Sequence, residues 1–176
     1  VDAIYQVEVD AVILHARKAW LKGLSPKENR DIPPLEYSKV YQIKQEFADL
    51  HLDINGGIHT LEEAENHLQQ VDGVMMGRAL YHQPYLLAEA DKRIFNDDRV
   101  IPSQHEIVEL MLPYIEMRMK EGSPLKSITR HMLGLFQGLP GARRWRRHLS
   151  ENAHLPGAGI EVVRDALRLL SRVEEE

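Results

Sequence analysis

The chain has 176 residues, a formal net charge of −5 and 43% hydrophobic residues, enough for one large domain or two small ones. The negative balance excludes a general polyanion binder, so any contact with nucleic acid must come from a local basic patch. The chain contains no cysteine, which excludes disulfides, thiolate metal sites and a cysteine nucleophile within these residues. No apolar run approaches about 18 residues and no signal-peptide core is found, which favours a soluble protein of the cytoplasm without a membrane partner.

The first predicted strand, Ala11–Leu14, leads directly into a long polar loop. The loop begins with His15, Arg17 and Lys18 and extends to Pro34. Loops of this length without a helical or strand period are uncommon in compact domains and are usually functional. A lone histidine is more often a core residue, but the two neighbouring cations favour a site for an anionic or electron-rich ligand. A metal site is not expected, because no second ligand stands at metal-ligand spacing.

Alternating strand and helix patterns continue to about residue 78. The predicted elements after the loop are a helix at 35–48, a strand at 51–55, a helix at 61–70 and a strand from Gly73. Thr60 and Glu63 have the spacing of a capping box at the start of the second helix. The β-α-β-α-β order with short connections predicts parallel strands joined by right-handed crossovers.

Glycines follow the second and third strands, as Asn55-Gly56-Gly57 and as Gly77-Arg78. Glycine lets backbone amides approach an anion, and the capped start of the helix after Thr60 adds its dipole and free amides. Either glycine pair alone would more often be a simple turn. Both pairs at one edge of a parallel sheet predict a phosphate site, which recurs at this position in α/β barrels.

Residues from about 96 onward are predicted to form a small bundle of helices. Ser103 and Glu106 form a second capping box, at the start of a helix that contains Pro113. The side chains expected on the buried face of that helix are Ile107, Leu110, Met111, Tyr114 and Ile115. Further helical stretches are predicted over 124–139, from Pro140 and over 159–173.

The helix that begins near Pro140 carries four arginines in its first two turns: Arg143, Arg144, Arg146 and Arg147. Cations at this end of a helix oppose its dipole at a cost of about 0.3–1 kcal/mol each, so a partner is expected. With Arg130 and His131 they form a basic patch, and Trp145 or Trp20 could stack on a base. RNA is the favoured partner of this patch. Two alternatives stay open: ion pairs of the arginines with Glu151 and Glu161, and contact with a protein partner.

Two further cations, Lys27 and Arg30, lie in the loop that follows the first strand. Their spacing alone indicates no more than charges on the protein surface.

Together these stretches closely resemble the tRNA-dihydrouridine synthases, specifically the bacterial A-type subfamily. The most specific stretch is 15–30, and 53–58, 71–78 and 81–85 support it in the right order. The resemblance implies an α/β plus all-α fold. Residues 1–95 would be the C-terminal part, about three βα units, of an FMN-binding (β/α)8 TIM barrel, and residues 96–176 a helical tRNA-binding domain.

The resemblance also implies a function and a set of contacts. The enzyme would reduce the C5=C6 bond of a flipped-out D-loop uridine in tRNA, with FMN as cofactor, NADPH as reductant and a cysteine acid at C5. The flavin would be held by His15, Asn55, Gly56, Gly57, Gly77 and Arg78. The tRNA would be contacted by Lys27, Arg30, Arg143 and Arg146.

One departure from the family is large, because this chain has no cysteine to serve as the acid. The chain begins at Val1 without a methionine, at residues that read as the end of a helix. We therefore expect a missing N-terminal barrel half, and no activity from this chain alone. Two alternatives stay open: a non-catalytic RNA-binding remnant, and another FMN-dependent barrel oxidoreductase that acts on a small molecule.

Overall fold

The computed structural model describes residues 5, 6 and 9–174, of which residues 171–174 are described by their backbone alone. The expected helix end at the start of the chain lies largely outside these residues. The chain divides into two compact units, Val1–Ala79 and Leu80–Glu176, and each is considered by itself. Within the described residues, no helix combines the length and the apolar character that crossing a membrane requires.

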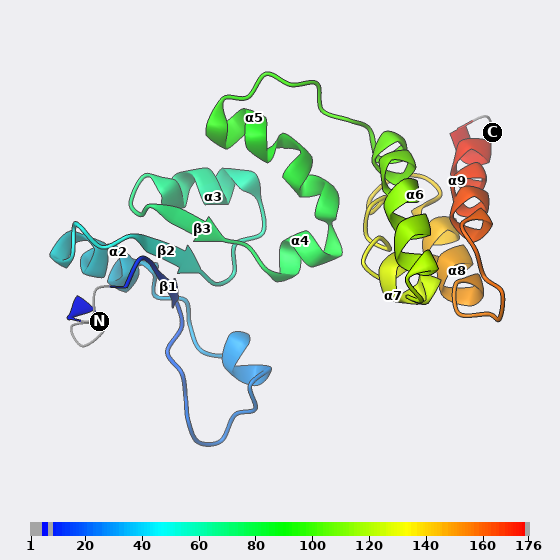
Figure 1. Cartoon of the computed structure of the whole chain (residues 1–176). Coiled ribbons are helices and arrows are strands. Elements are labelled where there is room, and N and C mark those ends of the chain that lie inside the picture. The colour runs from blue at the N-terminus through cyan, green and yellow to red at the C-terminus, as the bar shows by residue number, and fades with distance from the viewer. Residues whose placement is uncertain (1–4, 7–8, 175–176) are drawn as a thin grey trace. The chain divides into compact units, whose positions relative to one another are not determined.

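The first unit is built on a parallel three-stranded sheet with the order β1-β2-β3 (Figure 1). Its strands are β1 (Val12–His15), β2 (Leu52–Asn55) and β3 (Gly73–Met75). The connections hold the 3-10 helix η1 (Glu28–Arg30) and the helices α2 (Tyr37–Glu46) and α3 (Leu61–Leu68). The predicted β-α-β-α-β order is confirmed, and so is the capping box of Thr60 and Glu63.

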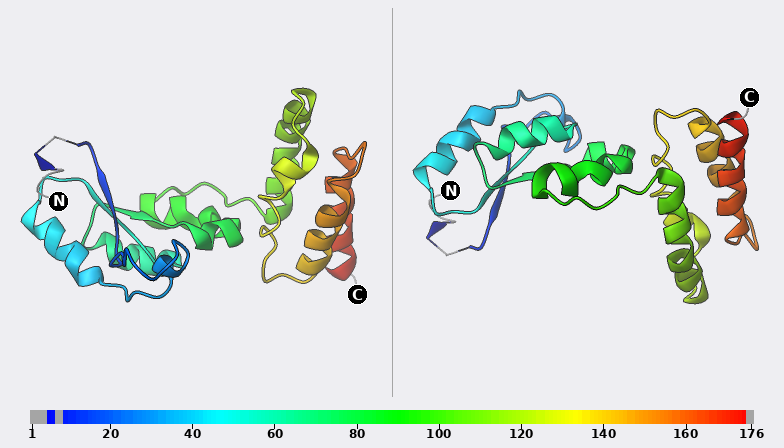
Figure 2. Two further views of the ribbon diagram at one scale, coloured as in Figure 1. Left: turned by 90° about the horizontal axis from the view of Figure 1, so that it is seen from below. Right: turned by 90° about the horizontal axis from the view of Figure 1, so that it is seen from above.

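The helices α2 and α3 lie on the same side of the sheet (Figure 2). Right-handed crossovers that advance in one direction along a sheet require this arrangement. The sheet side chains that pack against the helices include Leu52 and Ile54, both fully buried, which stabilises the unit by about 1.5–3 kcal/mol each. The alternate positions face the other way, where Ile13 and Met75 are about half exposed. One face of the sheet is therefore packed, and the other is partly open.

The described part of the second unit contains helices, turns and loops but no strand. In chain order its helices are α4 (Arg78–His82, which begins in the first unit), η2 (Pro84–Glu89), α5 (Ala90–Phe95), α6 (Gln104–Lys120), α7 (Leu125–Thr129), α8 (Ala142–Asn152) and α9 (Glu161–Glu174). Its core centres on Trp145 and Phe136, whose rings meet edge to face at 4.9 Å. The indole N–H of Trp145 donates to the carbonyl of Met132 at 3.1 Å, so the buried polar atom is satisfied.

The buried face predicted for α6 is partly wrong. Leu110 is 72% exposed and Tyr114 45%, whereas Val108 and Leu112 lie in the core. The cause is the apolar content of this helix, which continues around its circumference and leaves the helical period ambiguous. The capping box of Ser103 and Glu106 at its start is confirmed.

The predicted helical stretch over 124–139 is helical only in α7, which ends at Thr129. The residues after it form turns, yet Met132, Leu135 and Phe136 are buried as their spacing suggests. Gly138 adopts φ 88°, a conformation that a continuing helix does not allow.

The boundary between the structural units differs from the predicted domain boundary at residues 95 and 96. Residues 80–95 group with the helices that follow them. Gly134 explains part of this grouping, because its backbone lies directly against the carbonyl of His82.

Candidate functional site

The six residues predicted to bind the flavin line one cavity in the first unit, with a volume of about 160 Å³. They are His15, Asn55, Gly56, Gly57, Gly77 and Arg78. Arg30, predicted as a tRNA contact, lines the same cavity. The structure thus brings together three separate stretches of sequence at the carboxyl ends of the strands, where parallel sheets place their ligand sites.

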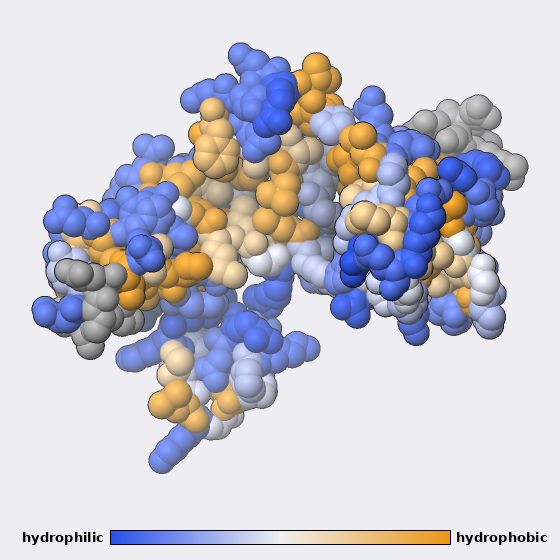
Figure 3. Space-filling view, in the orientation of Figure 1, coloured by the Kyte–Doolittle hydropathy of each residue, from blue (hydrophilic) through white to orange (hydrophobic). Residues whose placement is uncertain are grey.

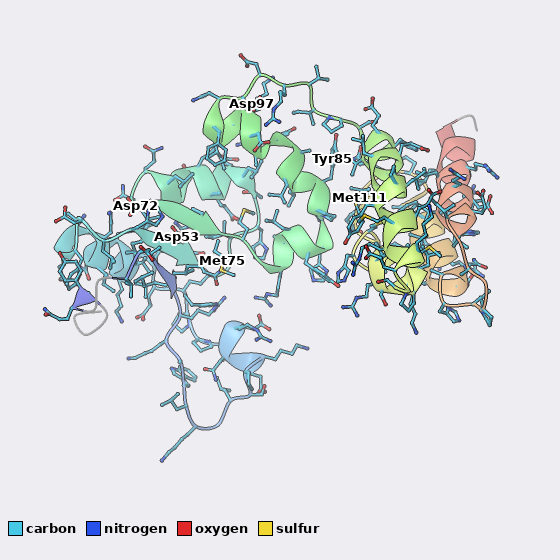
Figure 4. All side chains as sticks on the ribbon, viewed as in Figure 1. Asp53, Asp72, Met75, Tyr85, Asp97 and Met111 are labelled. Atoms are coloured by element: carbon cyan, nitrogen blue, oxygen red, sulfur yellow. The ribbon has the colours of Figure 1, made fainter. Side chains whose placement is uncertain are left out.

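The strand register explains this convergence. His15, Asn55 and Met75 stand opposite one another in β1, β2 and β3. The side-chain amide of Asn55 donates to the carbonyl of Met75 at 2.7 Å, and the backbone N–H of Ala16 donates to the carbonyl of Asn55 at 2.8 Å. Asn55 therefore ties the strand ends together at the cavity, and Figure 4 shows Met75 at the end of β3.

The turn after β2 requires glycine at both positions. Gly56 has φ 119° and Gly57 has φ 69°, which L side chains rarely adopt. A Cβ on Gly57 would lie 2.6 Å from Leu35 Cδ1, and one on Gly56 would lie 3.1 Å from His15 Cε1. The Tyr37 hydroxyl donates to the Gly56 carbonyl at 2.8 Å and fixes the turn to the start of α2. The backbone is thus held close to the His15 ring.

The electrostatics of the cavity are set by guanidinium groups. Burial lowers the pKa of His15, and the nearby charges of Arg17, Arg78 and Arg30 lower it further. The imidazole is therefore neutral at pH 7, because its ordinary pKa of about 6.5 already lies below that pH. Arg30 and Arg78 supply the positive charge that an anion would meet.

Arg78 already has a partner in the loop. Its Nη1 lies 2.6 Å from Oδ1 of Asp31, and this hydrogen bond holds the pKa of the Asp31 carboxyl below its usual range. Sequence patterns did not indicate Asp31, because the pair is 47 residues apart. An anion that binds Arg78 would compete with this carboxylate.

The start of α3 offers fewer amides than predicted. The backbone N–H groups of His59 and Thr60 donate to Oε2 of Glu63 at 2.6 and 3.1 Å, and that of Glu63 donates to the Thr60 hydroxyl. The expectation that the amides of this capped end are free is therefore wrong for these three residues. The capping box satisfies them and adds a carboxylate near the cavity, which His59 also lines.

The long loop after β1 is held by its own hydrogen bonds and is mostly hydrophilic on its surface (Figure 3). Arg17 donates to the carbonyls of Asp31 and Pro33, and Asn29 exchanges two hydrogen bonds with the backbone of Trp20. Arg17 therefore holds the two ends of the loop together through these hydrogen bonds, and it does not line the cavity. Lys27 is exposed on this loop.

The arginines of the basic patch on α8 are exposed, but the tryptophan among them is not. Arg143 and Arg146 are exposed, and Arg147 forms an ion pair with Glu151 at 2.8 Å. The expectation that Trp145 could stack on a base is wrong, because this side chain is fully buried in the core of the unit. Trp20, the other aromatic candidate, is 45% exposed.

Comparison with known proteins identifies the family to which this arrangement of residues belongs. The family model described as "Dihydrouridine synthase (Dus)" matches residues 1–171. The chain belongs to the dihydrouridine synthase family. The resemblance inferred from the sequence motifs is thereby confirmed.

Curated relatives of this family member carry the name tRNA-dihydrouridine(20/20a) synthase. A protein of Vibrio parahaemolyticus is 60% identical over 154 residues, which cover 88% of this chain and 47% of the relative. A protein of Shewanella oneidensis is 56% identical over 164 residues, which cover 93% of this chain and 49% of the relative. One of Escherichia coli is also 56% identical over 164 residues, with 93% and 50% covered. The chain spans about half the length of the curated relatives that it matches.

Proposed function

We propose that this chain supplies the FMN-phosphate site and tRNA-contacting residues of a tRNA-dihydrouridine synthase. This enzyme is an oxidoreductase that reduces the C5=C6 bond of a D-loop uridine in tRNA, with NADPH as reductant. The observation that carries the proposal is the strand-end cavity, which gathers the glycine turn, Asn55, His15 and two arginines. The names of the relatives support the choice of tRNA as substrate.

The residues of the cavity fit the phosphate-bearing end of FMN. Gly56 and Gly57 both line the cavity, so their backbone is open to a ligand there. Arg78 would bind the phosphate, Asn55 would help to hold the ribityl chain and phosphate, and His15 would contact the flavin ring. The cavity of about 160 Å³ is below the roughly 300–1,000 Å³ of whole-ligand pockets, so this chain would hold one end of the cofactor. When bound, FMN would supply the hydride for the reduction.

The sheet supports a partial barrel as the fold of the first unit. Its strands run in the order β1-β2-β3 with both helices on one side, as in a singly wound (β/α)8 barrel. We propose that it is the C-terminal part of such a barrel and that the helical unit is the tRNA-binding domain. The chain contains no cysteine, so a cysteine acid for C5 would come from outside these residues.

Four exposed cations are proposed to contact tRNA: Lys27, Arg30, Arg143 and Arg146. Guanidinium and ammonium groups of this kind position RNA through its phosphates. Arg30 also lines the strand-end cavity, so it would lie near the flavin as well as the RNA.

The test uses the whole protein that contains this chain. Arg78→Ala is expected to weaken FMN binding roughly 10- to 100-fold, because a charge-assisted hydrogen bond to the phosphate is lost. FMN binding would be measured by flavin fluorescence, and dihydrouridine in tRNA by mass spectrometry. Arg99→Ala is the matched control, because Arg99 is exposed, pairs with Asp97 and lies outside the cavity.

Two results would overturn the proposal. If the whole protein binds tRNA but binds neither FMN nor any flavin that NADPH can reduce, it is an RNA-binding protein that does not reduce uridine. A flavoprotein that oxidises NADPH but leaves tRNA uridine unreduced would be an oxidoreductase for a smaller substrate.

A further inference from the structure

A second cavity, of about 510 Å³, lies wholly within the helical unit, and of its lining residues only Arg146 has a role in the proposed function. Three stretches of chain form it: residues 81–83, residues 130–137 and Arg146 on α8. We call it the Tyr81 cavity. Its volume falls in the range of about 300–1,000 Å³ that is typical of ligand pockets.

Direct contact between two backbones builds one wall of this cavity. A Cβ on Gly134 would overlap the carbonyl group of His82, so only glycine permits this approach. The end of α4 is therefore packed tightly onto the turns that follow α7. This packing brings the side chains of residues 81–83 and 130–137 together around the cavity.

The cavity is positively charged and has no acidic lining residue. Arg130 Nε donates to the imidazole of His131 at 3.0 Å, and Arg146 Nη1 donates to Oε1 of Gln137 at 3.2 Å. Neither guanidinium has a carboxylate partner among the described residues. By contrast, Arg147 on the same helix is paired with Glu151. The two arginines of the cavity are thus available to an anion.

An accessible aromatic ring stands beside these cations. Tyr81 is 56% exposed, and its ring meets those of His82 and His131 edge to face, with centroids 6.0 and 5.8 Å apart. The neighbouring rings limit its movement while much of its surface remains accessible. Exposed aromatic rings next to arginines are the platforms on which proteins stack unpaired bases.

Gln137 adds a group that can form hydrogen bonds with a base edge. Because its Oε1 accepts from Arg146, its amide NH2 is left to donate. One ring, two guanidiniums and one amide donor in a cavity of this volume match the base and the phosphate of a single nucleotide. An acidic protein segment would bind the two guanidiniums but would leave the Tyr81 ring and the Gln137 amide without a partner.

We propose that the Tyr81 cavity binds one unstacked nucleotide of the tRNA, other than the uridine that is reduced. The base stacks on Tyr81 and accepts from Gln137, and the phosphate binds Arg130 and Arg146. This inference rests on the proposed function, because it takes tRNA as the substrate. It adds Tyr81, Arg130 and Gln137 to the residues that select and position the RNA.

The test compares Tyr81→Ala, Tyr81→Phe and Tyr114→Ala in the whole protein. Loss of stacking in Tyr81→Ala is expected to weaken tRNA binding about 5- to 150-fold, and Tyr81→Phe is expected to retain it. Tyr114→Ala is the control, since Tyr114 is 45% exposed but lies outside the cavity. Filter binding at one salt concentration gives the affinities, and melting curves check that each variant folds. Ultraviolet cross-linking to tRNA, mapped by mass spectrometry, is expected to attach a nucleotide near Tyr81 or His131.

Activity of the unmodified protein on tRNA distinguishes failure of the proposed function from failure of the nucleotide site. If it leaves tRNA uridine unreduced, the proposed function fails, and this inference fails with it. If it is active but a folded Tyr81→Ala variant binds tRNA with unchanged affinity, only the nucleotide site is wrong. An equal loss of tRNA affinity in Tyr81→Phe and Tyr81→Ala would contradict the proposal that a base stacks on the Tyr81 ring. Binding of an oligoglutamate peptide that is lost in Arg130→Ala, with tRNA affinity unchanged in Tyr81→Ala, would instead assign the cavity to an acidic protein segment.

Discussion

Arg78 lines the strand-end cavity, and its guanidinium is already hydrogen-bonded to a carboxylate. The Asp31 oxygen lies 2.6 Å away, yet both side chains are about half exposed. Water and salt screen an ion pair of this exposure, so it holds Arg78 only weakly against a stronger anion. A phosphate carries more charge and more acceptor oxygens than a carboxylate. We therefore expect the hydrogen bond between Arg78 and Asp31 to break when the phosphate of FMN binds Arg78.

Removing the Asp31 charge is expected to favour the cofactor. In the whole protein, Asp31→Asn should tighten FMN binding roughly two- to fivefold, because no carboxylate competes for Arg78. Titration of the flavin-free protein with FMN, followed by fluorescence quenching, measures the change. Asp97→Asn is the control, because Asp97 pairs with Arg99 and neither residue lines the cavity. Weaker binding in Asp31→Asn would show that Asp31 instead orients Arg78 for the phosphate.

The turn between β2 and α3 shows how an element depends on two glycines. Gly57 has φ 69° and lies against Leu35, while Gly56 lies against His15. The turn joins the strand that carries the buried Leu52 and Ile54 to a capped helix, so strain at either glycine acts on the core of the first unit. The proposed phosphate site and the stability of the unit therefore depend on the same backbone.

Gly57→Ala is expected to destabilise the first unit by about 1–3 kcal/mol, because alanine is strained at positive φ and its Cβ meets Leu35. Denaturant unfolding of the whole protein, with hydrogen exchange of the β2 amides, measures the loss. The matched control is Gly159→Ala, since a Cβ at Gly159 meets no atom within 4 Å. Equal stability of the two variants would contradict a strained turn.

The elements that the sequence predicts well are those encoded locally. Both capping boxes depend on residues three apart, and the strand ends are marked by glycine, so these features are confirmed. The buried face of α6 is not encoded in this way, because apolar residues surround the helix and only tertiary packing selects Val108 and Leu112. The hydrogen bond from Tyr37 to Gly56 is likewise not encoded locally, because its partners are 19 residues apart and meet only in the folded unit.

At the scale of the whole chain, the charge distribution matters more than the net charge of −5. Several arginines are balanced by acids a turn away, such as Arg164 by Glu161 and Arg168 by Asp165. Arg143 and Arg146 have no such carboxylate partner among the described side chains, and both are exposed. The sequence predicted this local basic patch because four arginines near a helix start are unusual. It could not reveal that Trp145, in the middle of them, is buried.

The salt dependence of tRNA binding tests whether these two arginines contact phosphates. Each phosphate contact contributes about 0.7–0.9 to the slope of log K against log salt concentration. The double variant Arg143→Ala, Arg146→Ala of the whole protein should therefore reduce the slope by about 1.4–1.8. The double variant Arg164→Ala, Arg168→Ala removes two guanidiniums that are paired with acids and should leave the slope unchanged. An equal reduction in both variants would mean that tRNA senses the general charge of the helical unit, because both variants remove the same number of charges. A reduction confined to the first variant would assign the contacts to α8, since only the position of the charges distinguishes the two.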